Sequence, residues 1–411
     1  MFSIILEITG LSACSLRPVI EFFKYLFNMN FKIGLLLPSS VIYPTINFDL
    51  INGLRSGLAS WGVSDVEIRT ESIGVGGRDK EIYNQCEKML MDGVNIIAGY
   101  INPMTAEKLN GLFVNANAIL LSLDAGYHYP SSLNKLSNTF YISLQGALCC
   151  RMVTKLATDD GAKKIAYTGS FYEAGYRSAY AFSKALNDVS GTITLNHITQ
   201  LKRVDFTIEP LQQHLNSEDT DAVFASYCGD MLQDFYNGAA DCDVFKKHPV
   251  YAAPFAGEQQ WLDQCVYPGT DIKVCVPWAR QLENEENARF VQVLSQKKQS
   301  ANVFSLLGWE AGTIIASITH IDDPDDALAQ LEQTVFQTPS GAAKFDAATH
   351  LWHAPVFNAL VRKNADTGMC ILSVVGESDQ TEVQRQRQYD DIRNVNGSFT
   401  SWLNSYACLE S

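Results

Sequence analysis

Apolar runs and amphipathic stretches alternate along most of the chain. The first run, Ile33–Leu37, is apolar at every position except Gly34, which is typical of a strand buried on both faces of a parallel sheet. It ends at Pro38, and the spacing of apolar residues predicts a helix from Asn47 to Trp61. The same succession of strand, loop and helix recurs to about residue 276 at the spacing of βαβ units. The pattern therefore predicts an α/β fold with mostly parallel sheets.

Polar or glycine-containing loops follow six of the predicted strands. Right-handed crossovers place such loops on one edge of a parallel sheet, where open α/β folds bind their ligands. They lie at residues 38–40, 99–105 and 123–126 in a first series, and at 169–176, 227–230 and 254–258 in a second. The first loop offers the hydroxyls of Ser39 and Ser40, without a GxGxxG motif or a lysine for a phosphate. This loop favours a small polar molecule over a nucleotide.

The two series predict two Rossmann-like lobes, each a mostly parallel sheet flanked by helices, joined by a hinge of three crossings. Lobes hinged in this way close around a ligand in the cleft between them. We expect the crossings near 141–147, 276–280 and 339–346. The predicted division is 1–28 for an N-terminal extension, 30–142 with 277–340 for lobe 1, 143–276 with 341–376 for lobe 2, and 377–411 for a C-terminal extension.

Composition narrows the possible partners. The chain of 411 residues has a net charge of −14, whereas nucleic-acid binding needs clustered Lys and Arg, so no nucleic-acid partner is expected. No apolar segment reaches the roughly 20 residues of a membrane span. The ten cysteines are scattered without a CxxC pair and fit small buried side chains.

The N-terminus leaves two alternatives open. Residues 1–28 lack the basic start of a secretory signal, yet Leu11–Cys14 resembles a lipoprotein cleavage box that would attach a lipid at Cys14. Alternatively, translation starts at Met29, which leads directly into the first strand, and the preceding residues are a wrongly assigned extension.

No catalytic or cofactor motif stands out. His350 and His353 have the spacing HxxH but lie in a predicted turn and strand, without nearby acids or cysteines in ligand spacing. No nucleophile elbow is present. We therefore expect no enzyme activity, no cofactor and no metal site.

Several segments, in order, resemble the type I periplasmic-binding-protein superfamily, in its branched-chain amino-acid and amide-binding branch. The resemblance is carried by Lys32–Ser40, Ile96–Tyr100, Phe171–Tyr176 and Thr338–Gly341, with Phe345-Asp346 and the stretch from Leu351 to Val356 after them. It covers about residues 30–376 and rests on the order of many weak motifs. It implies a receptor that closes on an amino acid, amide or small carboxylate and delivers it to an ABC permease. It also implies a periplasmic or cell-envelope location.

The resemblance also implies which residues bind the ligand. In that family the first lobe holds a carboxylate through hydroxyls and backbone N–H groups, and a tyrosine and an acid of the second lobe hold an ammonium group. The matching positions here are Ser39, Ser40, Asn102, Thr105, Asp124, Ala125 and Gly126 in the first lobe, and Tyr172, Tyr227, Phe255 and Glu258 in the second.

Two departures make a ligand other than an α-amino acid possible. Phe255 stands where the family usually presents its acid, with Glu258 a few residues on, and Asn102-Pro103-Met104 replaces small hydroxyls. Several assignments also have structural alternatives. Ser39, Ser40, Thr105 and Asp124 are residue types that cap helices, and Glu258 suits a surface or capping position.

Two further alternatives concern the whole chain and its end. A ligand-sensing regulator of the same fold, cytoplasmic if translation starts at Met29, is the alternative to a transport receptor. Residues 377–396 are polar and predict a surface segment. Phe399, Trp402, Leu403 and Tyr406 recur at helical spacing, which predicts a docked C-terminal helix or, alternatively, a partner-binding one.

Overall fold

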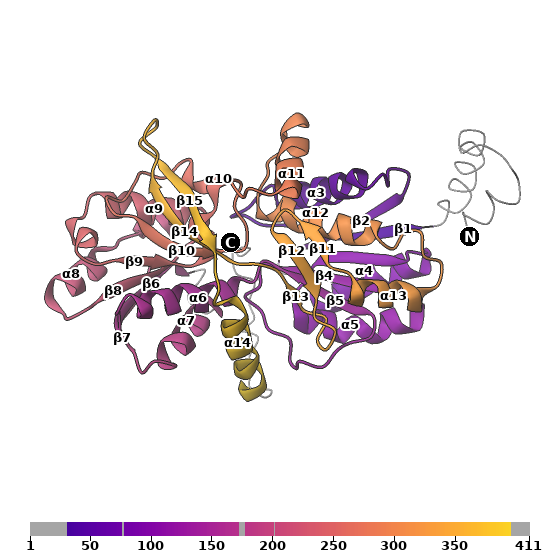
Figure 1. Cartoon of the computed structure of the whole chain (residues 1–411), viewed down its shortest axis with the longest axis horizontal. Helices are drawn as coiled ribbons and strands as arrows, with labels where there is room; N and C mark the ends of the chain where they lie inside the picture. Colours follow the sequence, from indigo (N-terminus) through magenta and orange to yellow (C-terminus); the bar gives the residue numbers. More distant parts are fainter. Residues whose placement is uncertain (1–30, 76–77, 172–176, 201, 396–411) are drawn as a thin grey trace, which may run out of the picture.

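Two sheets flanked by helices lie end to end along the long axis of the molecule (Figure 1). The computed structural model describes residues 31–75, 78–171, 177–200 and 202–395. Within these residues the predicted α/β class and the two-lobed arrangement are confirmed. The predicted helix at Phe399–Tyr406 lies outside the described residues.

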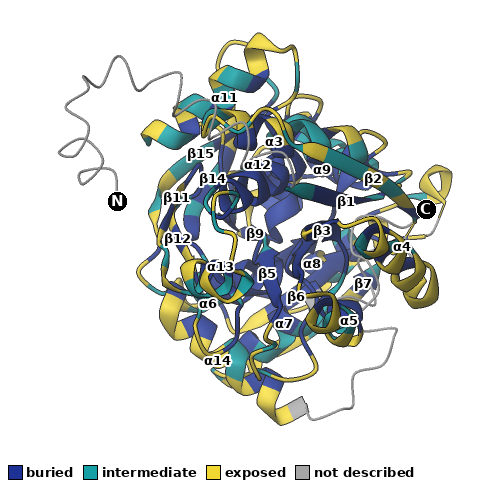
Figure 2. Ribbon diagram, turned by 90° about the vertical axis from the view of Figure 1, so that its right-hand side faces the viewer, coloured by how far each residue is buried: buried dark blue, intermediate teal, exposed yellow. Residues whose placement is uncertain are grey.

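The first sheet has five parallel strands in the order β2-β1-β3-β4-β5. They are β1 (Lys32–Pro38), β2 (Glu67–Gly74), β3 (Ile96–Tyr100), β4 (Ile119–Asp124) and β5 (Thr139–Ser143). Its helices are α3 (Ile46–Ser60), α4 (Asp79–Met91), α5 (Pro103–Ala116), α11 (Glu285–Gln296), α12 (Val303–Ala316) and α13 (Pro324–Gln333). Leu35 belongs to the core formed with α3 and α12, whereas Leu36 belongs to the core formed with α4 and α5. The apolar run of β1 is therefore buried on both faces, as predicted (Figure 2).

The second sheet has seven strands in the order β15-β14-β10-β9-β8-β6-β7. Strand β14 pairs antiparallel with both β10 and β15. Its strands are β6 (Lys164–Gly169), β7 (Thr192–Ile198), β8 (Ala222–Ser226), β9 (Val250–Ala252), β10 (Ile272–Val276), β14 (Phe357–Lys363) and β15 (Cys370–Glu377). Its helices are α6 (Gly146–Asp159), α7 (Arg177–Asn187), α8 (Glu209–Ser217), α9 (Gly229–Ala240) and α10 (Gln259–Leu262). Short 3-10 turns lie at η3 (Arg203–Asp205), η4 (Asp243–Lys246) and η5 (Pro254–Gly257).

A third, small sheet changes the predicted division. It consists of β11 (Phe336–Thr338), β12 (Gly341–Phe345) and β13 (Trp352–His353), and Leu351 forms a bridge to Tyr141 of β5. Strand pairing thus places 341–353 beside the first sheet, whereas the sequence division assigned residues from 341 to lobe 2. The third crossing accordingly runs through 354–356 rather than the expected 339–346.

The segment after β15 also differs from the expectation. Residues predicted to form a polar surface segment contain α14 (Thr381–Val395), which packs against α6. Arg385, Asp391 and Ile392 are buried there. Arg385 and Asp391 can be buried in this interface because each has a polar or oppositely charged partner. The spacing of apolar residues along the helix does not reveal such contacts.

Helices α3 and α12 pack backbone to backbone. A Cβ atom added to Gly53 would lie 2.1 Å from Ser305 O, and one added to Gly308 would lie 2.1 Å from Leu50 O. Only glycine fits at such an approach, and α3 and α12 are thereby held closely together beside the first sheet.

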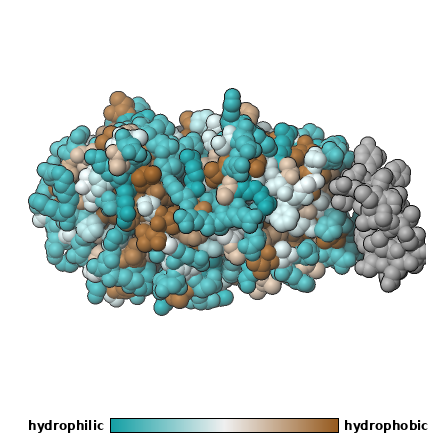
Figure 3. Space-filling view, turned by 45° about the horizontal axis from the view of Figure 1, so that its top comes forward, coloured by the Kyte–Doolittle hydropathy of each residue, from teal (hydrophilic) through white to brown (hydrophobic). Residues whose placement is uncertain are grey.

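Figure 3 shows a face on which hydrophilic side chains surround scattered hydrophobic ones. Among the described residues, no helix combines the length and the apolar character needed to cross a membrane.

Candidate functional site

Aromatic rings from both lobes meet where the strand-exit loops face each other. Tyr43 follows β1, and its ring centroid lies 4.9 Å from that of Phe304 in α12 and 6.0 Å from that of Phe255 in η5. The Phe255 ring is 6.1 Å from the Tyr127 ring in the loop after β4. We call Tyr43, Tyr127, Phe255 and Phe304 the aromatic junction, and all four are buried. These contacts show that the lobes are closed on one another.

A hydrogen bond reinforces the closed arrangement. Asn302, the N-cap of α12 in the first lobe, donates from Nδ2 to Gln260 Oε1 in α10 of the second lobe, at 3.1 Å. The same amide nitrogen donates to Asp49 Oδ2 in α3 at 2.9 Å. Polar groups therefore bridge the two lobes beside the aromatic junction.

A hollow of about 450 Å³, which is partly open to solvent, adjoins the aromatic junction, and we call it the cleft pocket. Its polar groups come from Glu258, Gln259 and Arg280. Its other lining residues are Ala125, Leu144, Pro254, Phe255, Gly257, Val276, Pro277, Trp278, Ala279, Val303 and Leu372. Mostly apolar walls with a few polar groups are typical of a small-molecule site.

Glu258 is the chemically distinctive residue of the cleft pocket. It is 7% exposed, and its Oε2 atom makes no hydrogen bond among the described residues. Burial raises the pKa of its carboxyl to about 8; the positive charge of Arg280 opposes this rise, and the negative charge of Asp49 adds to it. A buried carboxyl with an unpaired oxygen can accept a hydrogen bond from a ligand when ionised, or donate one when protonated.

The two serines after β1 shape their loop. Ser40 Oγ accepts a hydrogen bond from the backbone N–H of Tyr43 at 2.9 Å, which fixes the turn that carries the tyrosine into the junction. Ser39 donates its backbone N–H to Gly74 O at 2.9 Å, and its side chain is exposed. Neither serine caps a helix, because the N-cap of α3 is Thr45, and neither lines the cleft pocket.

Asn102 and Thr105 are engaged at the start of α5. Asn102 is the N-cap, and its Oδ1 accepts from the N–H of Thr105 at 2.9 Å. Thr105 Oγ1 donates to Asp79 Oδ1 of α4 at 2.8 Å. These polar atoms hold two helices of lobe 1 together, and neither residue lines the cleft pocket.

The loop after β4 divides between two hollows. Ala125 lines the cleft pocket, whereas Asp124 and Gly126 line a second hollow of about 510 Å³ on the other side of the loop. Asp124 Oδ1 accepts from the N–H of Gly126 at 2.9 Å, and its Oδ2 lies 3.6 Å from His128 Nδ1. Gly126 has φ +79°, and a Cβ there would lie 2.3 Å from the backbone nitrogen of Gln145. This loop therefore needs glycine where it touches the first crossing.

Tyr227 does not line the cleft pocket. The Tyr227 hydroxyl lies 2.6 Å from Thr168 Oγ1, and its ring stacks on Phe235 with centroids 4.5 Å apart. At 1% exposed it belongs to the core of the second lobe. Tyr172 lies outside the described residues. Phe255 and Glu258 are the predicted second-lobe residues that line the pocket.

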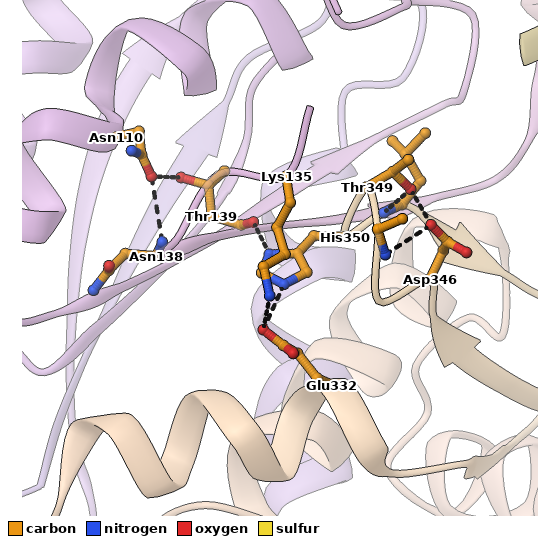
Figure 4. A network of polar contacts seen from close by, with 10 residues as sticks. Asn110, Lys135, Asn138, Thr139, Glu332, Asp346, Thr349 and His350 are labelled. Atoms are coloured by element: carbon orange, nitrogen blue, oxygen red, sulfur yellow. Dashed lines mark hydrogen bonds and ion pairs between the residues drawn. The ribbon is translucent and has the colours of Figure 1, made fainter. Parts of the chain in front are cut away.

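Figure 4 shows the polar contacts of His350, the first histidine of the HxxH pair. His350 Nδ1 lies 2.9 Å from Thr139 O, and its Nε2 lies 3.0 Å from Glu332 Oε1. His353 Nε2 instead lies 2.7 Å from the Tyr389 hydroxyl. The two rings thus have separate partners, and the described residues contain no group of three or more metal-binding side chains.

Tyr43, Tyr127 and Phe304 are residues of the site that the sequence analysis missed. Phe304 lies some 180 residues beyond Tyr127 in the chain, so local patterns could not join them. A usable signal was present at Tyr43 and Tyr127, since each lies in or beside a predicted strand-exit loop. Trp278 lines the cleft pocket and also packs, because its Nε1 donates to Asn287 Oδ1 of α11 at 2.7 Å.

Comparisons with known proteins agree with this architecture. Residues 30–366 match the family described as periplasmic binding protein. No curated protein sequence matches the chain significantly. An ABC transporter substrate-binding protein from Sphaerobacter thermophilus has a similar structure, with a TM-score of 0.72, 18% identity, and coverage of 85% of this chain and 97% of that one.

Two further solved structures are similar. A solute-binding protein of an ABC transporter from Rhodopseudomonas palustris BisB5, in complex with 3,4-dihydroxybenzoic acid, gives a TM-score of 0.68 at 15% identity, covering 85% of this chain and 97% of that one. A putative branched-chain amino acid ABC transporter protein from Rhodospirillum rubrum gives 0.64 at 15% identity, covering 84% and 100%. At these identities the likeness establishes the fold, and the match over residues 30–366 shows that the chain belongs to the periplasmic binding protein family.

Proposed function

We propose that this protein is the solute-binding component of an ABC transporter, working in the periplasm or cell envelope and delivering its ligand to a permease. The observation that carries the proposal is the closed cleft, whose mostly apolar pocket contains a buried carboxyl with an unpaired oxygen, together with Gln259 and Arg280. A receptor of this kind closes because the ligand binds the closed state more tightly than the open one.

The ligand class follows from the pocket lining. The rings of Phe255 and Trp278 and the side chains of Leu144 and Val303 suit a flat or branched apolar body. Glu258 and Arg280 at the same pocket suit one hydrogen-bond donor and one carboxylate on that body. We therefore propose a small carboxylate with an aromatic or apolar body and a hydroxyl or amino group. Structural neighbours in complex with hydroxybenzoates and benzoate support this class.

A thermal-shift screen tests the proposal. The probes are benzoate, 4-hydroxybenzoate, 3,4-dihydroxybenzoate and leucine, each at about 1 mM. A ligand that binds the folded state stabilises it by RT ln(1 + [L]/Kd), about 2.7 kcal/mol at one hundred times Kd. We expect a hydroxybenzoate to raise the melting temperature more than benzoate does, because only the former can donate to Glu258.

Variants locate the binding. Phe255→Leu keeps an apolar side chain but removes the ring, and we expect it to weaken binding of the stabilising probe at least tenfold. Gln299→Ala, on the α11–α12 connection outside the pocket lining, is the control and should bind normally. No shift with any probe would contradict the ligand class, and equal affinity in Phe255→Leu would contradict the location.

A further inference from the structure

Helix α14 lies beyond the region that matches the family, yet it reaches the hinge. The family match ends at residue 366, and α14 begins at Thr381. Its buried residues face α6 and the crossings, and the second hollow of about 510 Å³ lies between it and the first lobe. In Figure 1 the helix runs alongside the junction of the two lobes.

Arg385 of α14 joins two of the three crossings. Its Nη1 donates to Gln145 Oε1 in the first crossing at 2.7 Å, and its Nη2 donates to Ala354 O in the third crossing at 3.2 Å. Gln145 Nε2 donates to the same carbonyl at 3.2 Å. The guanidinium, the carboxamide and the carbonyl therefore form a closed ring of hydrogen bonds between two hinge segments. The Arg385 side chain is 6% exposed, so water does not replace these bonds easily.

Gln145 occupies an unusual backbone position. Its φ is +53°, in the left-handed region that non-glycine residues rarely adopt. Glycine would fit that conformation with less strain, but it would supply neither the donor nor the acceptor that Arg385 and Ala354 use. The hydrogen bonds at the hinge therefore depend on the glutamine side chain at this position.

The rest of α14 is fixed to both lobes. Asp391 Oδ2 accepts from Arg151 Nη1 of α6 at 2.6 Å, which attaches the helix to the second lobe. The Tyr389 hydroxyl lies 2.7 Å from His353 Nε2 of β13, which belongs to the small sheet beside the first lobe. A rotation of one lobe against the other must change one of these two attachments.

We propose that α14 is a brace across the hinge, and that Arg385 is a positioning residue that holds the first and third crossings at the spacing of the closed arrangement. Lobe opening requires the crossings to change their backbone angles. A bond network made in the closed state shifts the open–closed equilibrium toward closure, and the apparent affinity for a ligand improves in proportion to the closed fraction. Losing one charge-assisted hydrogen bond of this kind should change the equilibrium about tenfold.

The test uses the ligand-free chain of 411 residues, so its outcome does not depend on the ligand class proposed above. Small-angle X-ray scattering gives the radius of gyration, and amide hydrogen exchange reports on segments 143–147 and 354–356. Arg385→Met should increase the radius of gyration and speed exchange in both segments about tenfold. Arg393→Met is the matched control, because Arg393 lies on the same helix with an exposed side chain paired to Asp390.

A second variant separates bracing from general loss of structure. Gln145→Gly removes the side chain and relaxes the backbone, so it should also open the hinge while leaving exchange in β1 and β8 unchanged. Combining it with Arg385→Met should add little, because both changes break one network. If both single variants keep the wild-type radius and the wild-type exchange of the two crossings, the brace is disproved. An equal rise in exchange throughout the chain would disprove it as well, because the variants would then have lowered stability everywhere rather than at the hinge.

Discussion

Glu258 gives the sharpest energetic prediction, because its carboxyl should make the protein less stable as the pH rises. Burial raises its pKa from 4.5 to about 8 in the folded protein. Between these values the folded chain holds a proton that the unfolded chain has released, so unfolding is favoured as pH increases. The contribution to stability is complete below pH 4.5 and is lost as the pH rises through 8.

The size of the effect follows from the shift. The difference of 8 minus 4.5 is about 3.5 units, which at 1.36 kcal/mol per unit corresponds to about 5 kcal/mol as an upper bound. Structural relaxation and water entry reduce such penalties, and we expect about 2–3 kcal/mol between pH 5 and pH 8. Glu258→Gln is close in shape and cannot ionise, so it should lose this part of the pH dependence.

Urea unfolding at pH 5, 6, 7 and 8 measures the free energy of unfolding of wild type and Glu258→Gln. Glu377→Gln, at the exposed end of β15, is the control for the change from a carboxyl to an amide. The stability difference between Glu258→Gln and wild type should grow with pH, with most of its change between pH 5 and pH 8. If the two proteins show parallel profiles over this range, the buried, unpaired state of Glu258 is refuted.

Three further variants test packing and buried charge. Phe255→Ala should cost about 3–5 kcal/mol in chemical denaturation, because it removes a ring that contacts three others in the aromatic junction. Arg151→Met should cost about 3–5 kcal/mol, because it leaves the buried carboxyl of Asp391 without its main partner, and adding Asp391→Leu should recover part of this loss. Gly308→Ala should lower the melting temperature, because the added Cβ forces α12 away from α3. Gly111→Ala in α5, where a Cβ would meet open space, should instead stabilise the protein by about 0.5–1 kcal/mol. Equal effects of the two variants would contradict the close packing of α3 and α12.

The sequence predicted the strands and their exit loops because these depend on local patterns. The unbroken apolar run of β1 and the alternating βα units indicate two lobes directly. The six predicted exit loops begin within two residues of the ends of β1, β3, β4, β6, β8 and β9. The small sheet was harder, because β12 joins β11 by a tight turn beside the first lobe, and no local pattern tells which lobe such a hairpin joins.

The direction of side chains in the exit loops was only partly predictable. Val223, Ala225 and Tyr227 belong to one core of the second lobe, whereas Phe224 and Cys228 belong to the core on the other face. The alternation of β8 thus continues into its exit loop and turns Tyr227 away from the cleft pocket. Strand periodicity extended by one residue would have given this result.

Burial of charged residues was not predictable, since it depends on contacts between distant segments. Arg385 contacts Gln145 and Arg151 contacts Asp391, each across 240 residues of sequence. The spacing of residues along such a helix predicts a solvent-exposed position, because it gives no information about partners elsewhere in the chain. Glu258 does occupy a capping position, the N-cap of α10, but its burial could not be predicted from the local sequence.

The position of Glu258 connects stability with ligand binding. Closing the empty cleft buries a carboxyl oxygen without a hydrogen bond, which opposes closure by about 1–3 kcal/mol. A ligand that donates to this oxygen removes the penalty only in the closed state, because only there is the carboxyl cut off from water. The donor group therefore contributes to the difference in affinity between the two states, and it is this difference that drives closure. Hence a probe that lacks the donor should bind more weakly and also close the lobes less completely at saturation, which scattering of the saturated complexes can measure.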